Sequence, residues 1–125
     1  MKRLLKVFFV AAVMGFLSFG PAEAQYQGGG ELYEMCFGEG RFSEEKLKPT
    51  AEGVCWGIIV GIGDILVSGQ EVSGFRVCAT NQKVGQNRGV VIGIVKKYLK
   101  AHPDKADLPA YALVAEALQE AYPCE

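Results

Sequence analysis

The sequence predicts an all-α protein: a small bundle of four to five helices stapled by two disulfides. Three observations lead to this prediction. Apolar residues recur at helical spacing in several segments that glycine and proline separate. The chain contains four cysteines, an even number. Its N-terminal segment is typical of proteins exported to an oxidising compartment, where disulfides persist.

Residues 1–24 have the three parts of a secretory signal peptide. The basic residues Lys2, Arg3 and Lys6 come first, and residues 7–20 then form an apolar run without charge. Ala22 and Ala24 supply the small-residue pattern that signal peptidase accepts. The apolar run is shorter than the roughly 20 residues of a membrane-spanning helix. We therefore expect cleavage after residue 24, a single mature domain over residues 25–125, and export to an oxidising compartment.

The charge of the mature chain excludes some partners. Removing residues 1–24 takes away three of 13 basic residues and one of 14 acidic residues, which leaves 10 basic and 13 acidic residues. A slightly acidic balance provides no basic surface for nucleic acid and no polybasic patch for a membrane. We therefore expect neither nucleic acid nor, after signal cleavage, a membrane as partner.

The four cysteines predict a disulfide framework. Cys36, Cys55, Cys78 and Cys124 all lie in the mature chain, and four cysteines allow three pairings. Zinc is the competing interpretation, but the chain has no C-x-x-C motif and His102 is its only histidine. We therefore predict two disulfides and no metal.

The first part of the mature chain predicts a frayed end, a short helix and a loop. Gln25 to Gly30 is polar and glycine-rich, which is typical of a frayed terminus. Glu31 to Phe37 has apolar residues at helical spacing, and Gly38 and Gly40 end that helix. Phe42 to Pro49 is charged and mixed, so we predict a loop with at most one helical turn.

The next segment is apolar all round. We predict that Thr50 caps a helix carried by Gly53 to Val67, although a buried strand is an alternative for the β-branched run at residues 54–62. Length favours a helix, as does the four-residue spacing of Gly53, Gly57 and Gly61. Glycine costs about 1 kcal/mol of helix propensity relative to alanine. We therefore expect these glycines to allow another helix to approach closely.

Two further helices follow a long connection at Ser68 to Asn81. Val84 to Ala101 carries a full apolar stripe and a second glycine ridge, formed by Gly85, Gly89 and Gly93. We expect the two glycine ridges to cross each other. For the last helix we predict that Asp107 is the cap, that Pro109 lies in the first turn, and that the stripe extends over residues 111–122.

This order of helices suggests the disulfide pairing. If neighbouring helices run antiparallel through short loops, Cys36 at the end of the first helix lies near Cys55, early in the second. In an antiparallel hairpin of the last two helices, Cys78 before the third helix meets Cys124 after the fourth. We therefore predict the pairs Cys36–Cys55 and Cys78–Cys124, each worth about 3 kcal/mol in the chain-entropy model.

No catalytic group of residues stands out, so we predict a protein that is not an enzyme and holds no cofactor. His102 would be the base of any triad, but it ends a helix just before Pro103, where its positive form caps the helix. Asp64 shares the glycine face of its helix. If buried it needs a partner, and we expect that partner to be Arg88 or the backbone near it in preference to another protein.

The residues together resemble the Rap/Tai family, the immunity proteins of type VI secretion amidase effectors. The resemblance spans Met35 to Cys124 and depends on the order and spacing of its parts. Those parts are Cys55-x-Gly57-x-x-x-Gly61-x-x-Asp64, Cys78, Val84-Gly85-Gln86, Tyr98-Leu99-x-x-His102-Pro103 and Leu113-Val114-x-x-Ala117-Leu118-x-x-Ala121-Tyr122-Pro123-Cys124. The chain departs from the family at Ile58, where an aromatic residue is common, and at Ala79-Thr80, which replaces a proline-containing turn.

The resemblance implies a helical periplasmic protein, often a homodimer, that blocks the catalytic cleft of a peptidoglycan amidase. We expect loops to carry recognition, since a stapled scaffold presents them at low entropic cost. The candidate loops are Phe42 to Pro49 and Ser68 to Arg76. Phe75 and Arg76 are the candidate binding residues, because their types are frequent at binding hot spots; Phe75 is equally well interpreted as a core anchor. The alternative function is a periplasmic structural or chaperone-like protein without an amidase partner.

Overall fold

The computed structural model describes residues 28–78 and 87–124 of the chain, so the predicted signal peptide lies outside it. In this part the chain forms four α-helices and two short 3-10 helices, with no strand beyond two isolated bridges. In chain order the elements are α2 (Gly29–Phe37), η1 (Gly40–Phe42), α3 (Lys48–Val67), α5 (Arg88–Ala101), η2 (Pro103–Lys105) and α6 (Ala110–Ala121). The predicted all-α fold with two disulfides is confirmed.

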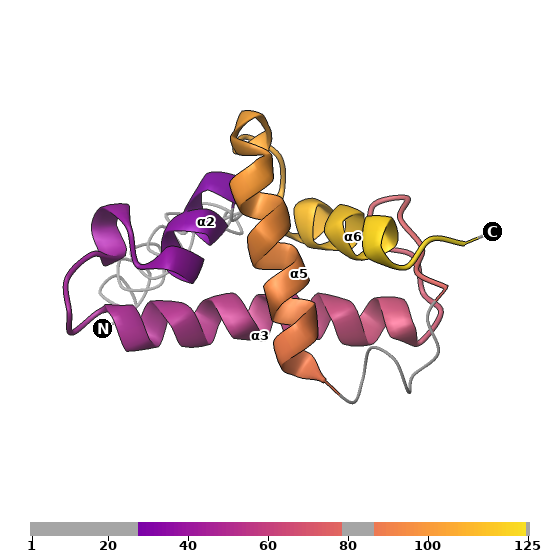
Figure 1. Ribbon diagram of the computed structural model, residues 1–125, viewed down its shortest axis with the longest axis horizontal. Helices are drawn as coiled ribbons and strands as arrows, with labels where there is room; N and C mark the ends of the chain where they lie inside the picture. Colours follow the sequence, from indigo (N-terminus) through magenta and orange to yellow (C-terminus); the bar gives the residue numbers. More distant parts are fainter. Residues whose placement is uncertain (1–27, 79–86, 125) are drawn as a thin grey trace, which may run out of the picture.

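The longest helix, α3, forms the base on which the other helices pack. Figure 1 shows α2 above the first half of α3 and α6 above its second half, while α5 runs across α3 between them. All three of these helices contact α3. The bundle is therefore organised by one long helix and not by successive antiparallel hairpins.

The core lies where the four helices meet. One face of α3 contributes side chains that are fully buried, Cys55, Ile59 and Leu66. The last helix supplies the other half of the core, because Leu113, Val114, Ala115, Ala117 and Leu118 of α6 are all buried. Apolar periodicity correctly identified Val114, Ala115 and Leu118 as part of this buried face, but Tyr111, at the start of the predicted stripe, is exposed.

The glycines at the start of the described chain are ordered, in contrast to the frayed end that we predicted. Gly28 forms a bridge with Pro109, and the amides of Gly29 and Gly30 donate to the carbonyl oxygens of Leu108 (2.7 Å) and Ala106 (2.9 Å). A side chain at Gly29 would overlap Leu113. Glycine here thus lets the first turn of α2 pack directly on the loop before α6, while residues 25–27 lie outside the described part.

Two predicted helix caps, Thr50 and Asp107, were wrong. The second helix begins at Lys48 with Leu47 as its N-cap, so Thr50 is inside the helix and Pro49 occupies its first turn, where a missing amide costs nothing. The N-cap of α6 is Pro109 and not Asp107, so Pro109 precedes the first turn, which begins at Ala110, and no side chain caps this helix. For α5 the N-cap is Asn87, whose side chain accepts from the Val90 amide; residues 84–86 are outside the description.

The described residues of the two glycine ridges do not meet within the chain. Gly53, Gly57 and Gly61 of α3 have no atom within 4 Å of the position that a β-carbon would take, and the same holds for Gly93 of α5. Gly85 is not among the described residues. The buried face of α3 is the opposite one, since large apolar side chains bury more surface than glycine does. The glycine face of α3 is therefore open.

Both predicted disulfides are present. Cys36 pairs with Cys55 and Cys78 with Cys124, with Cα–Cα distances of 5.2 and 4.8 Å. The first bond joins α2 to α3, and the second joins the connection after α3 to the end of α6. The pairing was predicted from antiparallel neighbouring helices, and this assumption held only in part. The helices α5 and α6 do not form the antiparallel hairpin that we assumed (Figure 1).

By length and composition alone α3 is apolar enough to cross a membrane, with a mean hydropathy of 1.6. Core helices of globular proteins pass the same test, and one face of α3 is packed against the other three helices. Only 28% of the apolar stretch is buried inside the protein. The remaining surface of α3 is consequently an unusually apolar outer face.

Candidate functional site

The connection after α3 ends in a tight hairpin-like turn. Val72 and Phe75 form an antiparallel bridge in which each amide donates to the carbonyl oxygen of the other, at 3.1 and 3.0 Å. Ser73 and Gly74 between them have φ angles of 54° and 83°. Two successive positive φ angles are the signature of a type I′ turn, which favours glycine at the second position. The loop from Ser68 to Val77, called here the hairpin loop, therefore has a defined tip.

The base of the hairpin loop is fixed to the end of α6. The amide of Cys78 donates to the carbonyl oxygen of Tyr122 at 3.2 Å, and Cys78 is bonded to Cys124. Val77, just before the disulfide, is buried. Covalent and apolar contacts thus hold the two ends of the loop while the tip stays outside the core.

The two predicted binding residues have different surroundings. Phe75 is half-buried and packs against the core, as the core-anchor interpretation predicted. Arg76 points outward, with 67% of its side chain exposed, and makes only a loose ion pair with Glu71 at 3.9 Å. An exposed pair of this kind contributes little to stability. Arg76 is therefore free to exchange Glu71 for a carboxylate on another molecule.

The second candidate loop lies at the opposite end of the molecule. Residues 43–50 are exposed and follow η1, and Figure 1 shows this segment beside the start of α3 while the hairpin loop follows its end. A helix of 20 residues spans about 30 Å. Arg41 at this end pairs with Glu31 and lies over the Phe42 ring. The structure therefore separates the two candidate loops, so they form two distinct surfaces.

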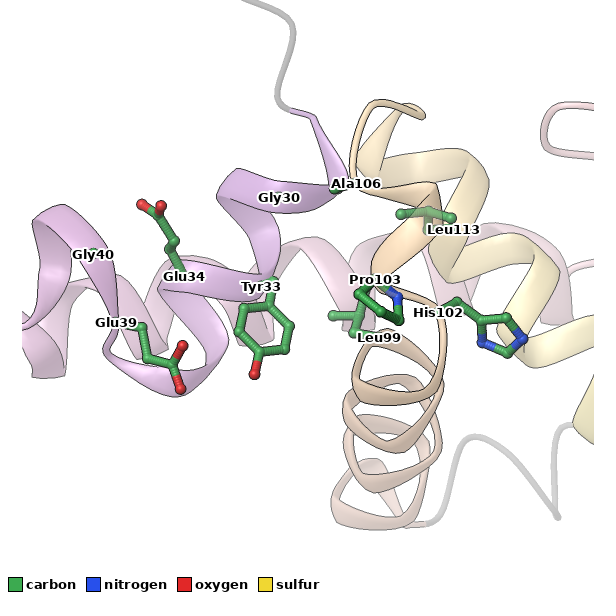
Figure 2. A pocket seen from close by; sticks show the side chains of 11 residues that line it. Gly30, Tyr33, Glu34, Glu39, Gly40, Leu99, His102, Pro103, Ala106 and Leu113 are labelled. Carbon is green, nitrogen blue, oxygen red and sulfur yellow. The ribbon is translucent and has the colours of Figure 1, made fainter.

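His102 caps α5, as predicted. Its amide donates to the Tyr98 carbonyl oxygen at 3.1 Å, its Nδ1 lies 2.9 Å from the same oxygen, and its ring stacks on that of Tyr98. His102 also borders a cleft of about 310 Å³ between α2, η1 and the end of α5. Figure 2 shows its ring directed away from Tyr33, Glu34 and Glu39, the polar side chains across the cleft. These groups do not form the contacts of a catalytic triad.

An ion pair between Lys105 and Glu116 joins η2 to α6. The Lys105 ammonium donates to Glu116 at 2.8 Å and to the Tyr98 hydroxyl at 2.7 Å. Burial opposes the charged form of Glu116, but the hydrogen bonds from Lys105 and Tyr98 outweigh it and lower its pKa. Burial raises the pKa of Tyr98, and the bond to Glu116 raises that of Lys105. This group is structural, because it joins η2 to both α5 and α6.

Asp64 does not make the contact that we predicted. It is exposed on the open glycine face of α3, and within the described residues neither Asp64 nor Arg88 takes part in an ion pair. The expected pairing of these two residues inside the chain is wrong, because Asp64 is not buried and needs no internal partner. No group of three potential metal ligands occurs among the described residues.

Comparison with known protein families agrees with the resemblance seen in the sequence. A family model of the Rap1a immunity proteins matches residues 28–124, which includes every described helix and both disulfides. No protein of curated function matches the chain significantly. The match covers most of the sequence and begins where the described fold begins. The chain therefore belongs to the family of Rap1a immunity proteins.

Proposed function

We propose that this protein is a periplasmic immunity protein that binds and blocks a peptidoglycan amidase delivered by the type VI secretion system of a neighbouring cell. Membership of the Rap1a immunity family carries the proposal, because it supports an immunity function against a secreted effector. A protein in this role acts by binding and not by catalysis. The two disulfides are consistent with the oxidising periplasm.

We place the effector contact on the hairpin loop. A loop whose tip is shaped by a tight turn and whose base is covalently fixed loses little conformational entropy on binding. Its tip is a four-residue turn, a shape better suited to a concave site than a helix face is. Arg76 would supply a guanidinium for carboxylates or carbonyl oxygens of the amidase, and Phe75 would hold the tip against the core.

The test is hydrolysis of peptidoglycan by the amidase encoded nearest this gene, with and without the oxidised mature protein. We expect a loss of hydrolysis at one-to-one stoichiometry and a complex that survives size-exclusion chromatography. No inhibition and no complex, with both disulfides verified by mass, would refute the immunity proposal.

A matched pair of variants tests the hairpin loop separately. Arg76→Glu reverses a charge on the hairpin loop, and Arg41→Glu reverses a comparably exposed arginine at the other end of α3. Each arginine has one acidic partner, and Arg41 is held the more firmly of the two, by its hydrogen bond to Glu31 and its position over the Phe42 ring, so any effect on the fold should be larger for the control variant. We expect Arg76→Glu to weaken inhibition by about tenfold or more and Arg41→Glu to leave it unchanged. The reverse result would move the contact to the loop at residues 42–49.

The resemblance also implies homodimers, and we include pairing with a second copy in the proposal. One observation favours the alternative of a chaperone-like binding protein: several large apolar side chains are exposed. They are Leu47, Val54, Trp56, Ile65, Val90, Leu108 and Tyr111. A chaperone-like role predicts suppression of aggregation of unrelated unfolded clients, and a gene without a neighbouring amidase would favour it.

A further inference from the structure

The open side of α3 holds an apolar hollow next to an exposed tryptophan. The hollow has a volume of about 520 Å³ and is lined by residues of α3 and of the first turns of α5. These are the two helices that cross in Figure 1. Its lining is almost wholly apolar apart from Arg88, and comprises Trp56, Gly57, Val60, Arg88, Gly89 and Ile92. Trp56 is 48% exposed, and Val54 and Val90 are exposed to a similar degree.

Glycines create the hollow. Gly57 and Gly89 lie in its lining, and a β-carbon at Gly57 would have no neighbour within 4 Å. Each helical glycine costs about 1 kcal/mol relative to alanine, and no contact in the described chain compensates that cost on α3. Large apolar patches on a single chain usually mark a contact with another molecule. This surface, the α3–α5 face, is thus suited to receive a projecting side chain.

The charges on the α3–α5 face indicate which molecule covers it. Asp64 lies one turn beyond Val60 on the exposed side of α3, and Arg88 lines the hollow on α5. Neither residue makes an ion pair within residues 28–78 and 87–124. Among the described residues, the face therefore carries one charge of each sign that has no ion-pair partner. Two identical faces of this kind attract each other, whereas an anionic membrane surface would require an excess of basic residues.

We propose that the α3–α5 face is the surface through which two copies of this protein pair about a two-fold axis. A two-fold interface needs a self-complementary surface, on which each copy supplies both a projection and a cavity. Trp56 supplies the projection, the hollow supplies the cavity, and Asp64 of one copy meets Arg88 of the other. The inference rests on the proposed homodimer but not on the identity of the effector, and it uses a surface distinct from the hairpin loop.

The chain contains its own probe of this interface, because Trp56 is its only tryptophan. We expect light scattering to show a dimer of the oxidised mature protein. We also expect the emission of Trp56 to shift to shorter wavelength over the concentration range in which the dimer forms. A protein that stays monomeric at all accessible concentrations would overturn both the homodimer and this interface.

Paired substitutions separate the interface from the fold. Trp56→Glu and Leu108→Glu each put a carboxylate at an apolar side chain that is nearly half exposed, at 48% and 44%, but only the first lies on the α3–α5 face. We expect Trp56→Glu to raise the dimer dissociation constant by about a hundredfold or more and Leu108→Glu to leave it unchanged. A dimer that tolerates Trp56→Glu would retain the homodimer and overturn the assignment of its surface.

Charge reversal provides a readout that misfolding cannot imitate. We expect Asp64→Arg and Arg88→Asp each to weaken the dimer by about tenfold, since each places like charges opposite one another. The double variant should recover most of the wild-type affinity. Two weakened single variants without recovery in the double variant would contradict the proposed pairing of these residues and with it the two-fold arrangement. Amidase inhibition by each variant, measured in parallel, shows whether the effector contact is independent of the dimer.

Discussion

Removing the disulfide at the base of the hairpin loop should impair both stability and function. The perturbation is the double variant Cys78→Ala/Cys124→Ala, whose two positions are exposed, so that no buried cavity accompanies the change. The bond closes a segment with a sequence separation of 46, and the chain-entropy model gives about 4 kcal/mol for a loop of that length. The same substitution also frees the end of the hairpin loop from α6.

The other disulfide provides the control. Cys36 and Cys55 are separated by 19 residues, for which the same model gives about 3 kcal/mol. Both cysteines are buried at the junction of α2 and α3, and the alanine double variant there adds the loss of two buried sulfur atoms. The two double variants should therefore have comparable stabilities, although only one of them releases the hairpin loop.

The assays are urea unfolding and inhibition of the cognate amidase. We expect both variants to lower the unfolding midpoint by about 2–3 M urea, from the slope typical of a domain of this size. At a temperature where both remain folded, only Cys78→Ala/Cys124→Ala should lose inhibition, because its loop must pay the ordering entropy on binding. Equal inhibition by the two folded variants would refute the argument that the disulfide prepares the loop for binding.

Three further changes test the packing and the electrostatics. Gly29→Ala should lower the free energy of unfolding by about 1–3 kcal/mol, since its methyl group would overlap Leu113; chemical denaturation measures this, and an unchanged stability would show that α2 can shift. Ile59→Ala should cost about 2–5 kcal/mol, because the side chain is fully buried, and a loss below 1 kcal/mol would contradict the core described above. The lowered pKa of Glu116 predicts stability that is present above its ordinary value of 4.5 and lost as pH falls through the lower folded value. Glu116→Gln should remove this acid-side dependence, by no more than about 1 kcal/mol for a pair that solvent partly reaches, and an identical pH profile in both proteins would refute the assignment.

The sequence predicted best what depends on local periodicity. The predicted stripe of the last helix included the buried residues Val114, Ala115 and Leu118, although Tyr111 is exposed, and the order of the cysteines led to both disulfides. Sequence reasoning failed where contacts with a distant segment of the chain determine the local conformation. The amides of Gly29 and Gly30 are held by carbonyl oxygens some 75 residues away along the chain, and no local pattern records that contact.

The glycine ridges show a different limit. Their four-residue spacing correctly placed Gly53, Gly57 and Gly61 on one face of a helix, but the expected approach of a second helix to that face is wrong for the described residues. Burial in α3 follows the larger apolar residues, so the glycines face outward. The hairpin loop was partly accessible to sequence reasoning, because Ser73-Gly74 is a sequence compatible with a tight turn. The bridge between Val72 and Phe75 that defines the tip required the structure.

The order of the disulfides along the chain has a consequence for how the protein matures. The first two cysteines are bonded to each other, Cys36 to Cys55, and so are the last two, Cys78 to Cys124. The two covalent loops therefore do not overlap along the chain. If the chain is oxidised progressively from its N-terminal end, each unpaired thiol meets its native partner before any other free thiol. Of the three possible pairings, this is the only one in which no thiol has to stay free while another free thiol lies between it and its partner in the sequence. Correct oxidation therefore needs an oxidant but no step in which a wrong bond is broken and remade.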